Sequence, residues 1–157
     1  MAFQFMNAED ALSASAAECY VTLDGNRYNM MNAISVEAKM DKSKKEVSIL
    51  GKTGKGNKAI GFKGTGSATF HFNNSLFRAK AIEYARTGKD FYFDMQITNE
   101  DPTSGVGRQT IILKNCNFDS MLLAKFDAGG DLLEEDMDFT FDDVEMPEEF
   151  TVMAGME

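Results

Sequence analysis

The amino-acid sequence predicts a mainly β fold, an antiparallel β-sandwich or barrel-like fold of short strands with one short α-helix. Three observations support this prediction. Apolar and polar residues alternate along several short segments, turn-forming Gly, Asp and Asn residues separate those segments, and a single segment has helical spacing. No segment repeats with a period of 20 to 50 residues, so a solenoid is not indicated.

The length and composition indicate one β domain with two terminal segments. The chain has 157 residues and is 43% hydrophobic, which is enough to bury one core. Residues 1–17 are predicted to be an N-terminal extension that could become ordered on assembly. Residues 18–150 form the predicted β domain, and residues 151–157 a C-terminal tail.

The first strands are predicted around a hairpin turn at Asp24-Gly25-Asn26. Alternation from Ile34 to Met40 predicts a strand with one buried face, and residues 44–50, KKEVSIL, predict the next strand. Ala68, Phe70 and Phe72 alternate in the strand that follows the glycine-rich stretch 50–61.

Residues 74–91 interrupt this pattern with apolar residues at helical spacing. Asn74 or Ser75 can cap the start of a helix and Gly88 can end it. Strands are then predicted in 91–98, in 108–118, in 120–128 and from Asp131 onward, where Met137, Phe139 and Phe141 alternate with polar residues.

The charge distribution is uneven along the chain. The net charge is -9, which argues against a protein that grips nucleic acid, because such binding requires Lys and Arg along the phosphates. Lysines gather between positions 39 and 63, whereas acids accumulate toward the C-terminus. One end of a subunit could therefore attract the opposite end of another, although an ordinary solvated surface would look similar.

The stretch LGKTGKGNKAIG, Leu50–Gly61, resembles a nucleotide-phosphate loop at first sight. A Walker A loop would need a glycine where the chain has Glu46, and a helix afterwards to bind phosphate. The next segment alternates with period two and is predicted to be a strand. The stretch is therefore interpreted as a flexible, positively charged hairpin tip, with no cofactor bound there.

Other chemical sites are not indicated. His71 is the only histidine and has no partner at a readable spacing, so a strand residue is expected in place of a catalytic base. The acidic clusters lack the calcium-loop pattern, so no metal site is predicted. Cys19 and Cys116 are expected to be reduced, partly buried thiols of a cytoplasmic soluble protein, since no membrane span or leader is apparent. No enzyme is predicted.

The order of segments resembles the tail tube proteins of contractile phage tails, of the type found in PBSX-like defective prophages and related bacteriocins. The resemblance covers roughly residues 18–149. Its most telling pieces are G.KGTGS at Gly61–Ser67, EDP..G at Glu100–Gly105 and NF....LA.FD at Asn117–Asp127.

The resemblance implies a subunit that forms hexameric rings, which stack into a hollow tube inside a contractile sheath. The tube is driven through a target envelope and conducts DNA in a phage. The implied partners are other copies of the chain, the sheath, and tape-measure and baseplate or terminator proteins, with DNA only as transient cargo and no stable membrane association. Assembly would take place in the bacterial cytoplasm, and the mature location would be the virion or particle.

Three surfaces are predicted to make these contacts. A hairpin over residues 44–62 should reach a neighbouring subunit or ring through Lys44, Lys45, Gly51, Lys52, Gly54, Lys55, Gly56, Lys58 and Gly61. A helix over residues 75–87 should face the sheath through Arg78, Lys80, Glu83 and Arg86. An acidic complementary or lumen surface should contain Glu134, Glu135, Asp136, Asp142 and Asp143. Solvent-exposed elements without a partner are the competing interpretation.

Two other classes of function remain open from the sequence. A soluble β-sandwich binding module would have a pocket with clustered aromatic residues, whereas these aromatic residues alternate along strands. The tube of a non-contractile tail or of a secretion system would share the same architecture, so the fold alone cannot separate it from a contractile tail tube.

Overall fold

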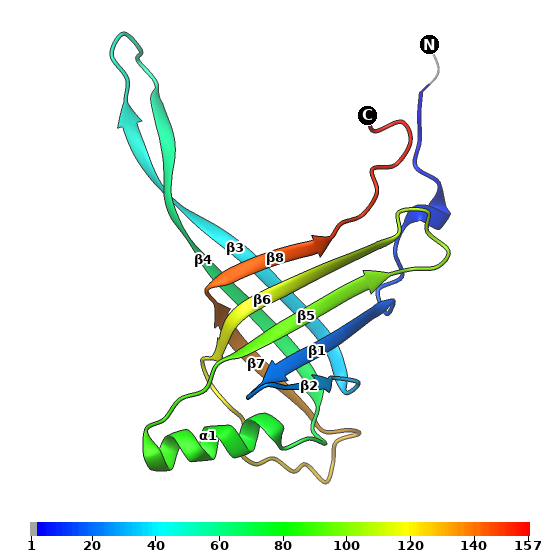
Figure 1. Cartoon of the computed structure of the whole chain (residues 1–157), viewed down its shortest axis with the longest axis vertical. Helices are drawn as coiled ribbons and strands as arrows, with labels where there is room; N and C mark the ends of the chain where they lie inside the picture. Colours follow the sequence, from blue (N-terminus) through cyan, green and yellow to red (C-terminus); the bar gives the residue numbers. More distant parts are fainter. Residues whose placement is uncertain (1–2) are drawn as a thin grey trace. The chain divides into compact units, whose positions relative to one another are not determined.

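The computed structural model describes residues 3–157, which form antiparallel β-strands and one α-helix (Figure 1). The elements are η1 (Ala8–Asp10), β1 (Ala17–Leu23), β2 (Asn26–Asn29), β3 (Ala33–Ser48), β4 (Lys55–His71), α1 (Leu76–Thr87), β5 (Phe93–Glu100), β6 (Arg108–Phe118), β7 (Glu134–Phe141) and β8 (Asp143–Glu148). This content confirms the predicted mainly antiparallel β fold with one short helix.

The chain divides into two compact units. The first unit combines the segment up to Met31 with Tyr92–Asn115 and Asp143–Glu157, and the second combines Asn32–Phe91 with Cys116–Asp142. Each unit is therefore assembled from segments that are distant in the sequence. The predicted domain boundaries at residues 17 and 150 stay predictions.

In the first unit, β1 pairs antiparallel with β2 and with β5, and β6 pairs with β8. The turn between β1 and β2 has Asp24 at φ 52° and Gly25 at φ 79°, the left-handed pair that a two-residue hairpin needs. This confirms the predicted turn. Val21, Met95 and Leu113 are buried and form part of the core of this unit.

The N-terminal segment is held by the loop after β5. The carboxylate of Asp101 accepts a hydrogen bond from the backbone N–H of Ser13 at 2.9 Å and another from that of Thr103 at 3.0 Å. These hydrogen bonds, from Ser13 first, lower the pKa of Asp101. Asp10 in turn accepts from Ser104 and Gly105, so residues around η1 have defined contacts within the unit.

The second unit is built on a long hairpin of β3 and β4. The two strands pair from Ala33 with Phe70 to Ser48 with Lys55, with a register shift between Ser43 and Lys44. The sequence pattern predicts separate strands before and after residue 41. The structure corrects that prediction, because charged residues in the middle of β3 interrupt its apolar alternation without interrupting its hydrogen bonding to β4.

Strand β7 covers only the inner part of this hairpin. It pairs with β4 from Gly64–Phe141 to His71–Glu134, and its own residues alternate between exposed and buried as predicted. Phe70, Met137 and Phe139 are buried here. The closing acidic segment is not one strand, however, since β7 ends at Phe141 and β8 pairs in the first unit.

The structure explains why two positions of the motif Gly61–Ser67 are occupied by glycine. A Cβ atom on Gly66 would overlap the ring of Phe139 and the backbone oxygen of Glu37, and one on Gly64 would overlap the ring of Phe141. These phenylalanines lie opposite the glycines in the β4–β7 register. The motif therefore makes room for two aromatic rings to lie across β4.

The helix has the boundaries that its sequence predicts. The side chain of Asn74 accepts a hydrogen bond from the backbone N–H of Leu76 at 2.8 Å, and Gly88 ends the helix at φ 76° while its N–H binds the Tyr84 carbonyl. Phe77 is buried and its ring contacts Phe118 edge-on at 4.8 Å between centroids. This contact anchors α1 to the end of β6 in the second unit.

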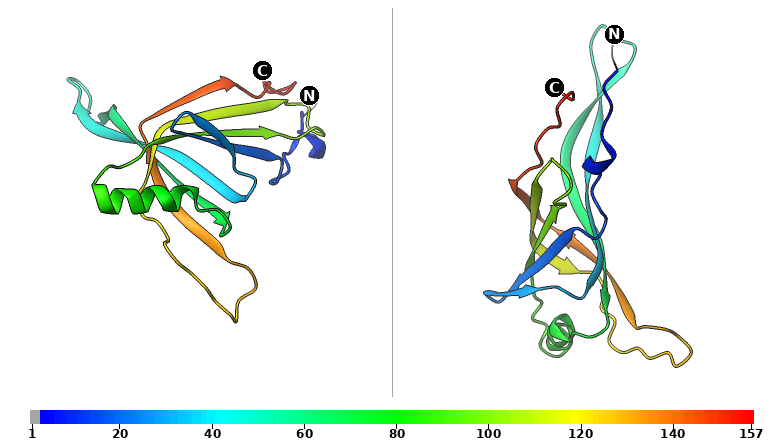
Figure 2. Two further views of the ribbon diagram at one scale, coloured as in Figure 1. Left: turned by 60° about the horizontal axis from the view of Figure 1, so that its bottom comes forward. Right: turned by 90° about the vertical axis from the view of Figure 1, so that its right-hand side faces the viewer.

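The strand predicted over residues 120–128 is absent. Residues 119–133 form an irregular connection between β6 and β7, which extends away from the strands in Figure 2. Leu123 and Phe126 are exposed, so the apolar residues that favoured a strand do not cover a sheet face.

Candidate assembly surfaces

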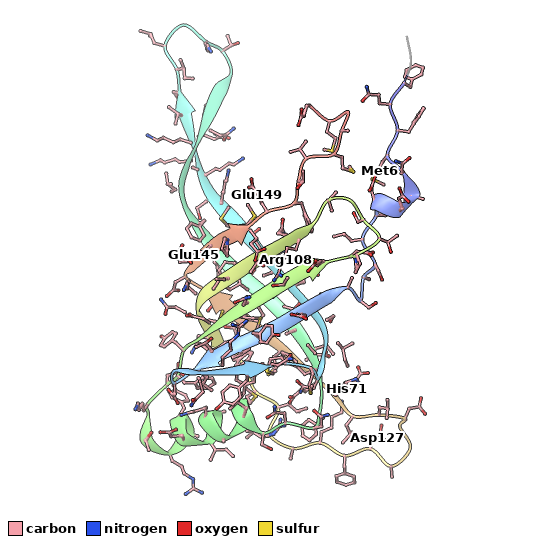
Figure 3. All side chains as sticks on the ribbon, turned by 45° about the vertical axis from the view of Figure 1, so that its right-hand side comes forward. Met6, His71, Arg108, Asp127, Glu145 and Glu149 are labelled. Atoms are coloured by element: carbon pink, nitrogen blue, oxygen red, sulfur yellow. The ribbon has the colours of Figure 1, made fainter. Side chains whose placement is uncertain are left out.

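The outer half of the β3–β4 hairpin, residues 41–63, projects beyond the part of the hairpin that pairs with β7. Every residue in this segment is exposed except the half-buried Gly56, and its side chains stand free on both sides of the ribbon (Figure 3). Strand β7 begins to pair only at Gly64. The two strands of the outer half therefore stabilise each other with no third strand beside them in the described part of the chain.

The hairpin residues singled out in the sequence are gathered here. Lys44 and Lys45 lie on β3, Lys52 lies in the connecting turn, and Lys55 and Lys58 lie on β4. Gly51 has φ 84°, which favours glycine in the turn. Strand β4 begins at Lys55, within the stretch Leu50–Gly61, so the structure has no helix there to bind a phosphate.

The outer half also carries apolar side chains, two of which, Val47 and Ile49, alternate with period two. Leu50 is fully exposed at 102%, Ile60 is 67% exposed, and Val47, Ile49 and Phe62 are exposed as well. The buried face predicted from Ile34 to Met40 is wrong, because Ile34 and Met40 are exposed. Period-two alternation shows only that a strand has two different faces. An apolar group of this kind on a projecting element is typical of a protein–protein contact.

The proposed sheath-facing helix surface needs one correction. The Arg78 side chain is 11% exposed and donates to the Glu135 carboxylate at 2.7 Å and to the Leu122 carbonyl at 3.0 Å. Its guanidinium also lies over the Phe72 ring, with 4.2 Å between Cζ and the ring centroid, a distance typical of cation–π contacts. Arg78 therefore connects α1 with β7 and with the 119–133 connection inside the second unit. Of the other predicted helix residues, Glu83 and Arg86 are exposed and Lys80 is half-buried.

The five predicted acidic residues do not form one surface. Glu135 is buried with Arg78, and Asp136 accepts a hydrogen bond from Thr69 at 2.7 Å on the β4–β7 sheet. Glu134 is exposed on β7, while Asp142 and Asp143 lie where β7 gives way to β8. The physical reason is the strand alternation, which sends successive side chains to opposite faces.

The sequence pattern does not single out Asp142–Glu149, which the structure shows as one acidic segment that includes β8. It contains five carboxylates and no basic residue, and all of its residues are exposed. Glu145 and Glu149 are labelled along and just beyond β8 in Figure 3. Lys114 and Arg108 of β6 lie near Glu145 and Glu148, at 4.0 and 3.2 Å, so two bases offset only part of this charge.

The single histidine and the two cysteines of the chain have contacts that stabilise the fold. His71 ends β4, where its backbone N–H binds the Asn32 carbonyl at 2.9 Å. Cys19 and Cys116 are free, buried thiols, and burial raises the pKa of Cys19 to about 11. Among residues 3–157, no three His, Cys, Asp or Glu side chains are grouped to hold a metal ion, and no helix has the length and apolarity to cross a membrane.

Comparison with known proteins gives relatives along nearly the whole chain. The family model described as "Phage tail tube protein" matches residues 4–148. The PBSX phage-like element protein XkdM of Bacillus subtilis strain 168 is 35% identical over 146 residues, which cover 93% of this chain and 97% of that protein. The Bacillus subtilis protein YqbM is also 35% identical, over 92% of this chain and 95% of its own.

Solved structures show the same fold. A structure of a Bacillus subtilis protein, 35% identical, covers 87% of this chain and 99% of its own with a TM-score of 0.54. A chain of the anti-feeding prophage baseplate covers 87% of this chain and 94% of its own at a TM-score of 0.61, with 13% identity. A chain of the PVC sheath–tube complex, an extracellular contractile injection system, covers 82% and 86% at a TM-score of 0.59, also with 13% identity.

The family match extends over both units and includes the hairpin, α1 and all of the Asp142–Glu149 segment except Glu149. Together with relatives at 35% identity over more than nine tenths of the chain, it confirms the resemblance found in the sequence. The chain belongs to the phage tail tube protein family.

Proposed function

We propose that the protein is the subunit of the inner tube of a contractile phage tail or phage-tail-like particle. Copies form hexameric rings, and the rings stack into a hollow tube that a contracting sheath drives through the target envelope. In a phage the lumen conducts DNA. Family membership supports the tube role, and the fold likeness to a chain of a sheath–tube complex supports a contractile particle.

The observation that carries this proposal is the exposed outer half of the hairpin. A chain that worked alone would gain nothing from displaying Leu50 and Ile60 on a projecting two-stranded ribbon, since such ribbons are marginal and prone to associate. A neighbouring subunit that covers these residues would remove their apolar surface from water. Head-to-tail contacts of this kind propagate without closing and generate a filament.

The remaining partners follow from the same architecture. The exposed face of α1, with Glu83 and Arg86, is available to the sheath, and the terminal segments are available to adjacent rings. Tape-measure and baseplate or terminator proteins would meet the ends of the tube. Subunits would assemble in the cytoplasm of the bacterial host and remain in the virion or particle, with DNA as a transient, non-specific cargo.

Electron microscopy of the concentrated full-length protein tests the proposal. Six-fold rings or hollow tubes are the expected products. A variant lacking Gly54–Lys58 should form few or no tubes, because the shortened hairpin cannot reach the next subunit. A deletion of equal length, Asp127–Asp131, shortens another exposed turn of the second unit and serves as the control. Tubes of normal length from the hairpin deletion would contradict a role of this hairpin in stacking.

A further inference from the structure

Lys45 and Lys58 form a cross-strand pair on the outer half of the hairpin. They are register partners in the β3–β4 ladder, so their side chains leave the same face side by side. Like charges placed directly opposite each other destabilise a strand pair. The nearest carboxylate in the hairpin, Glu46, lies on the other face, where it pairs with Lys55 at 3.8 Å. Asp41 shares the face of Lys45 but lies four residues farther from the tip, opposite Lys63, so no carboxylate lies on this face between the lysine pair and the tip.

The same face carries apolar side chains toward the tip. Val47 and Ile49 follow Lys45 with period two and are exposed. The Cδ1 atom of Ile49 lies 3.2 Å from the position that a Cβ of Gly56 would take, so Ile49 folds over the glycine of the opposite strand. Two ammonium groups beside an apolar patch suit a protein surface with carboxylates and short aliphatic side chains.

The acidic segment Asp142–Glu149 of the chain has this composition. It presents Val144 and Met146, both exposed, among its five carboxylates. Asp143, Glu145 and Glu148 have bases or backbone groups of their own unit nearby. Asp142 and Glu149 have no such neighbour within the described residues, so their charges are the least neutralised of the segment.

We propose that the Lys45–Lys58 face of one subunit binds the Asp142–Glu149 segment of a second copy of the chain. The ammonium groups of Lys45 and Lys58 lie against the Asp142 carboxylate, and Val47 and Ile49 cover Val144 and Met146, which follow Asp142 with the same period of two. Glu149, at the far end of the extended segment, adds to its negative potential. This contact deepens the proposed function and depends on it, because it assigns both surfaces of the contact between stacked copies. Opposite charge also selects this contact over the others that an apolar tip would allow.

Charge exchange in the full-length protein tests the contact. Lys45→Glu with Lys58→Glu replaces a pair of positive charges in the hairpin with a pair of negative charges. The repulsion within the pair stays similar, so the stability of the ribbon should be preserved while the charge of the face is reversed. The expected result is an increase of at least about tenfold in the protein concentration at which half the material is assembled, measured by sedimentation. Asp142→Lys with Glu149→Lys should have the same effect. Combining all four substitutions should restore assembly to within about threefold of wild type.

A matched control reverses two exposed lysines that belong to neither proposed surface, Lys42→Glu on the opposite face of β3 with Lys89→Glu after α1. Its net charge change equals that of the first variant, so a much smaller effect is expected if the face matters. Assembly of the Lys45/Lys58 variant at the wild-type concentration would overturn the contact, as would failure of the fourfold variant to recover or an equal loss in the control. A wild-type protein that forms neither rings nor tubes would overturn the proposed function itself.

Discussion

The inner and outer halves of the β3–β4 hairpin have similar sequence patterns and opposite surroundings. In the inner half, Ala68 and Phe70 alternate with polar residues and are buried beside β7. In the outer half, Val47 and Ile49 alternate in the same way and are exposed. The glycines differ correspondingly, since rings of β7 lie over Gly64 and Gly66, whereas nothing lies within 4 Å of a Cβ placed on Gly61.

This difference shows what hydrophobic alternation reports. It identifies a strand with one apolar face, but it does not say which chain covers that face. In the inner half the same polypeptide supplies the cover. In the outer half it does not, and the tube assembly proposed for the protein would supply it.

The largest effect is expected in the inner half. Phe139→Ala removes a buried ring that lies across Gly66, and we expect the free energy of unfolding to fall by about 3–5 kcal/mol. Urea denaturation of the unassembled chain measures this value. A loss below about 1 kcal/mol would mean that the inner half does not depend on its β7 cover.

A second effect concerns the first unit and provides a check on folding. The pKa of Cys19 is raised from 9.0 to about 11 by burial, so the folded protein holds the neutral thiol in a range where the unfolded chain loses its proton. This contribution to stability is complete below pH 9 and is lost as the pH rises toward 11. Roughly 2–3 kcal/mol should be lost for this thiol.

Comparison of wild type with Cys19→Ala isolates this contribution, because the other groups that titrate above pH 9 are common to both proteins. The difference in unfolding free energy between them should shrink as the pH is raised. A difference that stays constant from pH 8 to pH 11 would contradict the burial of the Cys19 thiol.

The glycines allow a matched pair of substitutions. Gly66→Ala forces a Cβ against the Phe139 ring and the Glu37 backbone oxygen, and should destabilise the chain by about 1–3 kcal/mol. Gly61→Ala meets no neighbouring atom, so its effect should stay within about 0.5 kcal/mol. Thermal unfolding of the two variants measures both effects. Equal losses in the free energy of unfolding would contradict the difference between the inner and outer halves of the hairpin.

The smallest effect on stability is expected at the hairpin tip. Leu50→Ser replaces a fully exposed side chain, so the free energy of unfolding should change by less than about 0.5 kcal/mol. The amount of assembled protein should nevertheless fall. Leu132→Ser, at another exposed leucine of the second unit, is the control and should leave assembly unchanged.

Local signals in the sequence were sufficient for much of the fold. The helix, its end at Gly88, the turn at Asp24-Gly25 and the alternation of β7 depend on interactions between residues close in sequence. Rejection of a phosphate loop at Gly51 rested on the same kind of signal, a strand pattern immediately after it.

Contacts between distant segments could not be predicted in this way. Arg78 and Glu135 were assigned to two separate surfaces, yet they form one buried pair across 57 residues of sequence. The connection after β6 has the apolar residues of a strand but no strand to pair with. The extent of β3 was underestimated because backbone pairing with β4 continues through its charged middle.

The lysines of the hairpin have a consequence for the direction of assembly. Residues 44–58 contain five lysines and a single acid, so two hairpin tips that approached each other would meet with the same sign of charge. A symmetric tip-to-tip dimer is therefore disfavoured, although the exposed leucine and isoleucines would otherwise promote it. In the proposed tube, this repulsion would keep free subunits apart and favour the addition of every subunit in the same orientation.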